Sequence, residues 1–147
     1  IEDAVFGAQE GMPEKVMDKA GFMEATGLTR EELQTASRIG LLIPYHQEKG
    51  RTLYNQEDVL FAREVLKKII SFGQDLHELS FYVDLGRQIV ECEMNLRRSA
   101  VKNRSAQENI RITAEISKMA DMLRGYILRR LFQRKVQAAI QKSLSDS

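Results

Sequence analysis

Apolar residues recur at helical spacing from the start of the chain. Val16, Ala20 and Met23 follow one another at steps of four and three and share one helical face. We therefore expect a first helix over residues 13–25, with a proline in its first turn. Gly27 supplies the turn after it, because glycine adopts positive φ without steric cost.

The stretch TREELQTASRIG predicts a second helix. Thr29 and Glu32 form a capping box, in which the hydroxyl and the carboxylate each bond a backbone N–H at the helix start. The helix begins at the next residue and ends at Gly40, with Leu33 and Ala36 facing inward. Two helices joined by a short glycine-containing turn are typical of a helix-turn-helix.

After this second helix, the residue pattern favours an extended backbone. Leu42 and Ile43, and again residues 52–54, favour β-strands, and residues 48–50 supply a turn between them. We expect a small β-hairpin, or wing, at this place.

Three further helices follow, over residues 55–73, 75–103 and 105–143. Each begins with a capping pair: Asn55 with Asp58, Asp75 with Glu78, and Ser105 with Glu108. The first of them has a core face made of Val59, Ala62, Leu66 and Ile69.

The last helix carries the seam of a coiled coil. Its apolar residues alternate at steps of four and three: Ile112, Ile116, Met119, Leu123 and Tyr126. A hairpin of two helices is too thin to bury such a stripe, so we expect a second copy to cover it. The expected dimer interface consists of Val83, Ile89, Val90, Ile112, Ile116, Met119, Leu123, Tyr126 and Ile127.

The predicted fold is mainly α. It is a winged helix-turn-helix with a small β-hairpin wing, followed by a long helical hairpin for dimerisation. We expect a linker or disordered end at 1–12, the winged helix-turn-helix at 13–75, the helical hairpin at 76–143 and a tail at 144–147. Because the chain begins with Ile1 rather than Met, we expect it to be a piece of a longer protein.

The composition, with 43% hydrophobic and 29% charged residues, is that of an ordinary soluble globular protein. No window approaches the ~18 consecutive apolar residues of a membrane span, so we expect a cytoplasmic protein without a membrane partner. The net charge of +1 conceals an asymmetry. Residues 1–96 carry 10 basic and 17 acidic side chains, whereas residues 97–147 carry 12 and 4. This asymmetry predicts a nucleic-acid or acidic partner for the C-terminal part, or attraction between the two halves.

Catalytic and metal-binding chemistry is not indicated. Cys92 is the only cysteine, and His46 and His77 lie apart without clustered carboxylates. The sequence contains no phosphate-binding glycine loop and no zinc-enzyme motif. We expect no enzymatic activity, no metal and no cofactor.

Four short motifs, in this order, resemble those of the MerR-type winged-helix transcription regulators over residues 15–85. They are ATGLTREEL, RIGLLIP, GRTLYNQEDV and SFGQDLHEL. The resemblance implies a homodimer that presents two recognition helices and two wings to a pseudo-palindromic operator in double-stranded DNA. Many members of that family distort promoter DNA so that RNA polymerase engages it, which implies the polymerase as a further partner.

The expected DNA contacts lie on the second helix and the wing. Arg30, near the start of the recognition helix, is the main candidate for a base or phosphate contact. Arg38 either reaches the DNA or pairs with Glu31 or Glu32. The full expected set is Thr29, Arg30, Gln34, Thr35, Arg38, Tyr45, His46, Lys49, Arg51, Thr52 and Tyr54.

Several contact residues of that family are replaced. Gln34, Thr35 and Ala36 occupy the positions of an Arg-Tyr-Tyr run, and Arg51 precedes the usual wing arginine position by one residue, which turns a strand side chain to the other face. Residues 15–75 carry nine basic and nine acidic side chains. A competing hypothesis is therefore a protein–protein interaction module that retains the winged shape without strong DNA binding.

The basic end of the last helix leaves three alternatives open. Its basic residues are Arg124, Arg129, Arg130, Arg134 and Lys135, and they surround Ile127, Leu128, Leu131 and Phe132. The segment is a dimer interface that meets the acidic half of the second copy, a surface for nucleic acid, or a surface for another partner, a membrane surface included.

Overall fold

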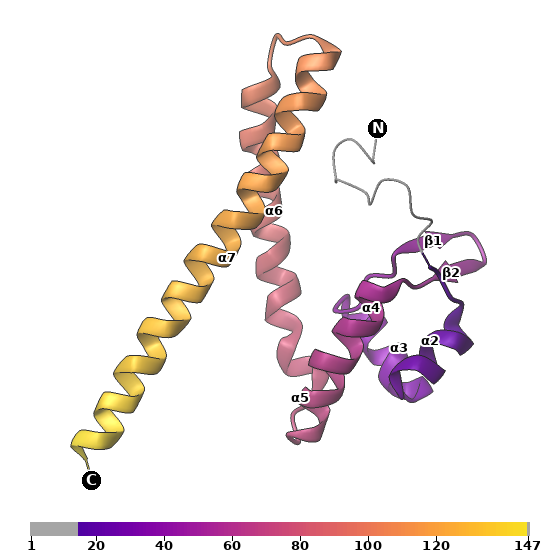
Figure 1. Cartoon of the computed structure of the whole chain (residues 1–147), viewed down its shortest axis with the longest axis vertical. Helices are drawn as coiled ribbons and strands as arrows, with labels where there is room; N and C mark the ends of the chain where they lie inside the picture. The colour runs from indigo at the N-terminus through magenta and orange to yellow at the C-terminus, as the bar shows by residue number, and fades with distance from the viewer. Residues whose placement is uncertain (1–14, 147) are drawn as a thin grey trace. The chain divides into compact units, whose positions relative to one another are not determined.

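The computed structural model describes residues 15–146, which divide into two compact units, 15–91 and 92–146. The chain is mainly helical, with one two-stranded antiparallel sheet and a long C-terminal helix (Figure 1). The linker expected at 1–12, the helix start at residue 13 and the last residue of the tail lie outside the described residues. No helix within 15–146 is long and apolar enough to cross a bilayer.

The elements of the first unit, in chain order, are α2 (Lys19–Thr26), α3 (Arg30–Ile39), β1 (His46–Glu48), β2 (Arg51–Leu53), α4 (Gln56–Phe61), a π-helical segment (Ala62–Leu66), α5 (Lys67–Ser71), a 3₁₀ helix (Leu76–Leu79) and the start of α6 (Ser80–Val101). The rest of α6 and all of α7 (Ala106–Ser145) belong to the second unit.

The first helix begins later than predicted. The backbone of Met17 is extended and exchanges two hydrogen bonds of 2.9 Å with Tyr54, so α2 starts only after this bridge. Asp18 caps the helix, because its carboxylate accepts the N–H of Gly21 at 2.9 Å. The buried residues of α2 are Phe22 and Thr26, whereas Val16 of the predicted apolar face is 42% exposed.

The prediction for α3 is confirmed. The Thr29 hydroxyl accepts the N–H of Glu32 at 3.1 Å, and the Glu32 carboxylate accepts the N–H of Thr29 at 2.9 Å. Leu33 and Ala36 are buried, and the helix ends at Gly40, whose φ of +91° belongs to the left-handed region.

The predicted hairpin is present, and β2 lies within one residue of its predicted place at 52–54, but the first strand lies elsewhere than predicted. The N–H groups of Leu41 and Leu42 bond the carbonyl of Ala36, so this segment completes the C-terminal cap of α3 and forms no strand. The first strand is instead β1, in which His46 faces Leu53 and Glu48 faces Arg51 across the ladder. Lys49 and Gly50, which has a φ of +73°, form the turn.

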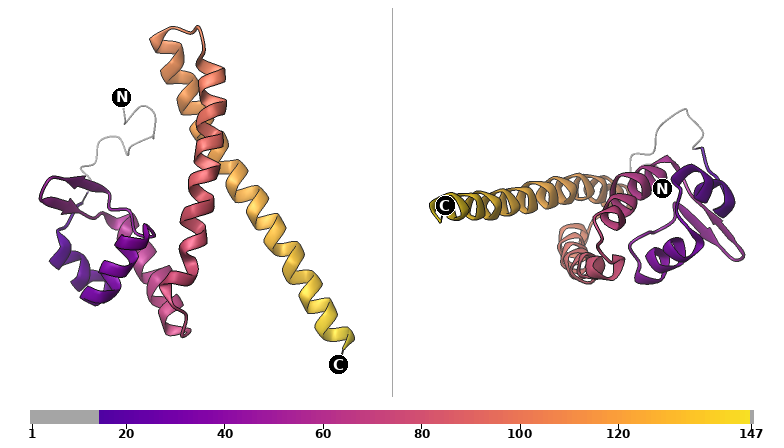
Figure 2. Two further views of the ribbon diagram at one scale, coloured as in Figure 1. Left: turned by 180° about the vertical axis from the view of Figure 1, so that it is seen from behind. Right: turned by 90° about the horizontal axis from the view of Figure 1, so that it is seen from below.

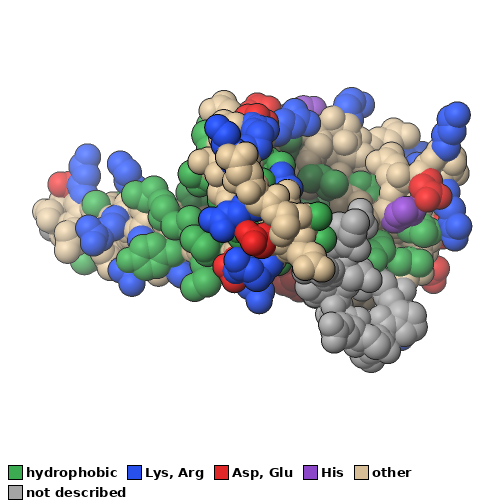
Figure 3. All heavy atoms as spheres, turned by 90° about the horizontal axis from the view of Figure 1, so that it is seen from above, with side chains coloured by type: hydrophobic (Ala, Val, Ile, Leu, Met, Phe, Trp, Pro, Cys, Tyr) green, Lys and Arg blue, Asp and Glu red, His purple; other side chains and the backbone are tan. Residues whose placement is uncertain are grey.

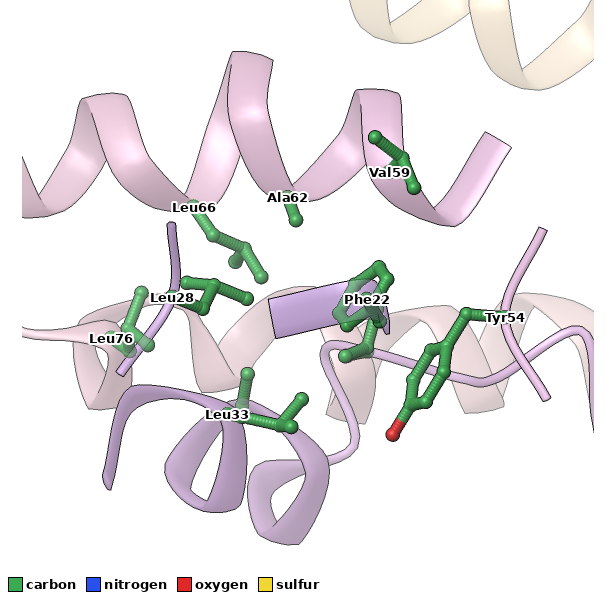
Figure 4. Packing of buried hydrophobic residues seen from close by; sticks show 10 residues of the cluster. Phe22, Leu28, Leu33, Tyr54, Val59, Ala62, Leu66 and Leu76 are labelled. Atoms are coloured by element: carbon green, nitrogen blue, oxygen red, sulfur yellow. The ribbon is translucent and has the colours of Figure 1, made fainter. Parts of the chain in front are cut away.

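One hydrophobic core holds the first unit together (Figure 4). The rings of Phe22 and Tyr54 stack with their centroids 4.1 Å apart. Leu66 packs there from the π-helical segment, and Leu76 from the 3₁₀ helix. Because Leu76 follows the boundary predicted at residue 75, the first unit extends beyond that boundary and into α6.

In the second unit the last part of α6 and the first part of α7 form an antiparallel helical hairpin (Figures 1 and 2). Arg97 of α6 donates to Thr113 at 2.9 Å and to Asn109 at 3.0 Å, and Arg124 forms an ion pair with Glu93. From residue 121 to residue 146 every residue of α7 is exposed.

The start and end of α7 differ in part from the prediction. Ser105 accepts the N–H of Glu108 at 3.1 Å, but the Glu108 carboxylate pairs with Arg104 instead of completing a capping box. The helix continues to Ser145, so the first two residues of the tail predicted at 144–147 are helical.

Candidate nucleic-acid interface

One side of α3 presents polar side chains to solvent. Arg30, Gln34 and Arg38 follow one another at steps of four, so they share one helical face, and all three are exposed. Thr35 is half-buried. Among residues 15–146, neither Arg30 nor Arg38 forms an ion pair, so the predicted alternative in which Arg38 pairs with Glu31 or Glu32 is not realised.

Glu32 is turned away from that face. The Lys67 ammonium lies 3.2 Å from the Glu32 carboxylate and also donates to the carbonyl of Gly27 at 3.1 Å. Burial opposes ionisation of Glu32, but the N–H of Thr29 and the Lys67 ammonium outweigh it and lower the pKa of the carboxyl. One of the two acids in the first turn of α3 is therefore occupied within the fold.

Acidification is expected to remove the stability that ionised Glu32 contributes. Its pKa in the folded state lies below the ordinary value of 4.5, so this contribution is complete above that value and disappears as the pH falls through the folded pKa. The melting temperatures of the wild type and of Glu32→Gln, compared between about pH 3 and pH 7, should differ at neutral pH and converge in acid. An equal difference at every pH would contradict this account.

The β1–β2 hairpin lies close to α2 (Figures 1 and 2). Side chains of α2, α3 and the hairpin line one hollow. Lys49 and Arg51 project from the hairpin without an ion pair to any described residue, whereas His46 lies 3.0 Å from Glu48. Two N–H groups, of Tyr45 at 2.9 Å and of Asn55 at 3.0 Å, donate to the carboxylate of Asp58. This buried carboxylate anchors the start of the hairpin to α4.

Two predicted contact residues have structural roles. Tyr54 is 2% exposed and stacks in the core, which differs from its predicted place on the DNA-facing surface. Burial, and next the charge of Asp58, raise the pKa of its hydroxyl, which therefore stays protonated. The Thr29 hydroxyl serves as the cap of α3. Thr52 is half-buried, and Tyr45 is exposed.

The sequence interpretation missed three residues of this region. Lys19, Ser37 and Gln47 line the hollow between α3 and the hairpin. Helical spacing places Ser37 three residues after Gln34, so that signal was available. Lys19 and Gln47 lack such a signal, because only the folded chain brings α2 and β1 to this hollow.

The predicted dimer residues divide between two environments. Val83 lies against the end of α3, where a Cβ atom added to Gly40 would approach its Cγ1 atom to 3.3 Å. The half-buried residues are Val83, Ile112 and Ile116. The exposed ones are Ile89, Val90, Met119, Leu123, Tyr126 and Ile127.

The described residues contain no group of three or more His, Cys, Asp or Glu side chains placed to hold a metal ion. Comparisons of this chain with protein-family models, with curated proteins and with solved structures find no match.

Proposed function

We propose that this chain is a MerR-like, sequence-specific DNA-binding transcription regulator, which acts in the cytoplasm as a dimer on a pseudo-palindromic operator. The observation that carries the proposal is the exposed row of Arg30, Gln34 and Arg38 on α3, next to a hairpin that presents Lys49 and Arg51. In this proposal the first unit is a winged helix-turn-helix, with α3 as its recognition helix and the hairpin as its wing.

The side-chain chemistry supports this assignment. Arginine reads guanine edges with two hydrogen bonds and glutamine reads adenine in the same way, both in the major groove. Cations on a hairpin neutralise phosphates and position the protein without reading sequence. A second copy, held through the exposed apolar side chains of α7, would set the two recognition helices about one helical turn of DNA, ~34 Å, apart or a multiple of that.

Selection of bound duplexes from a random library, at low and at physiological salt, tests the proposal. We expect a pseudo-palindromic sequence. The logarithm of the affinity should fall by about 0.9 per neutralised phosphate for each tenfold rise in salt concentration. Recovery of only weak, sequence-independent binding would contradict a sequence-specific regulator.

A protein–protein interaction module is the second candidate function. Hydrophobic and basic side chains mix along the exposed C-terminal end of α7, which Figure 3 shows at the left of its view. Large apolar side chains suit a protein surface better than a phosphate backbone. A specific complex that survives nuclease treatment, together with failure of the DNA selection, would favour this candidate.

A further inference from the structure

Two neighbouring hollows meet at the start of α2. The first, of about 420 Å³, lies between α3 and the hairpin, and the second, of about 600 Å³, lies between the start of α2 and β2. Lys19 and Thr52 line both hollows. A ligand that extends from one hollow to the other would therefore contact both Lys19 and Thr52.

The charges around these hollows favour an anion. Among the described residues, Lys19 is the only charged side chain that lines the first hollow. In the second hollow the charged side chains of the described part of the chain are Lys19, Arg51 and one acid, Asp18, whose carboxylate already accepts the N–H of Gly21. Lys19 and Arg51 form no ion pair with any residue of the described part of the chain. Two cations are thus available to a ligand.

The neutral side chains of the first hollow suit phosphate oxygens. Gln34 and Ser37 come from α3, and Gln47 and Thr52 come from the hairpin, and each carries an N–H or O–H donor. The remaining wall is apolar and includes Ile43 and Pro44. A phosphodiester, with an anionic phosphate between two largely apolar sugars, matches this combination.

We propose that Lys19 binds a backbone phosphate of the nucleic acid, assisted by the donors of Gln34 and Ser37 on α3 and of Gln47 and Thr52 on the hairpin. The inference rests on the proposed DNA binding and adds a contact from α2 to it. Gln34 carries no charge, so the cation of this hollow comes from the helix that precedes the recognition helix. Such a contact strengthens binding to every sequence alike.

Binding of fluorescent duplexes, measured by anisotropy over a series of salt concentrations, tests this contact. Lys19→Met removes the charge and keeps most of the side-chain length, Lys19→Gln is a second neutral variant, and Lys19→Arg restores the cation. Lys68→Met is the matched control, because Lys68 is an exposed lysine of the same unit that pairs with Glu64. Two duplexes of unrelated sequence are compared, and circular dichroism verifies that each variant is folded.

We expect both neutral variants to lose roughly tenfold in affinity at about 0.1 M salt, equally on both duplexes. The slope of the logarithm of the affinity against the logarithm of the salt concentration should be shallower by about 0.9. Lys19→Arg and Lys68→Met should retain the wild-type slope. An unchanged slope in the two neutral variants, while the wild type binds, would overturn the phosphate contact alone. Absence of binding by the wild type would overturn the proposed function together with this inference.

Discussion

Phe22→Ala is expected to destabilise the unit of residues 15–91 by about 3–5 kcal/mol. The ring of Phe22 is fully buried and stacks on Tyr54, which is itself buried. Truncation removes these contacts and leaves a cavity that the surrounding helices fill only in part. Since small domains are stable by about 5–15 kcal/mol, a large part of the stability of this unit should be lost.

Native-state hydrogen exchange, read by peptide mass spectrometry, is the suitable measurement, because it reports residues 15–91 separately from α7. Leu60→Ala is the control, since Leu60 belongs to the same unit and is 51% exposed. It should change the free energy of opening by no more than about 0.5 kcal/mol. Equal protection of residues 15–91 in Phe22→Ala and in the wild type would contradict the described core.

Arg30→Ala is expected to weaken binding to the selected operator by about 1–3 kcal/mol and to relax the sequence preference at one position of each half-site. Arg30 is the first residue of α3, is exposed and has no ion pair within the described residues. The helix itself should persist, because the cap is formed by Thr29 and alanine is a good helix former.

Competition binding with operators that carry single base changes measures both effects. The matched control is Arg63→Ala, an exposed arginine in the π-helical segment of the same unit. It should retain the wild-type affinity and the wild-type ranking of operators. If Arg30→Ala kept both properties too, α3 would not be the element that reads the DNA.

The features that depend on hydrogen bonds between near neighbours could be predicted from the sequence. The capping boxes of Thr29 with Glu32 and of Asn55 with Asp58 both form, since each joins residues only three positions apart. Gly40 ends α3 for the same local reason, because its positive φ requires no distant partner. The exposed row on α3 also followed from helical spacing.

The features that join distant parts of the chain could not be predicted in this way, because they depend on tertiary packing. The bridge between Met17 and Tyr54, which lie far apart in the sequence, delays the start of α2. Lys19 reaches the hollow beside α3 only because α2 and the hairpin pack together. The spacing of apolar residues indicates which side of a helix or strand is buried, but it does not indicate which other element packs against that side. The partner is chosen by packing between residues that lie far apart in the sequence.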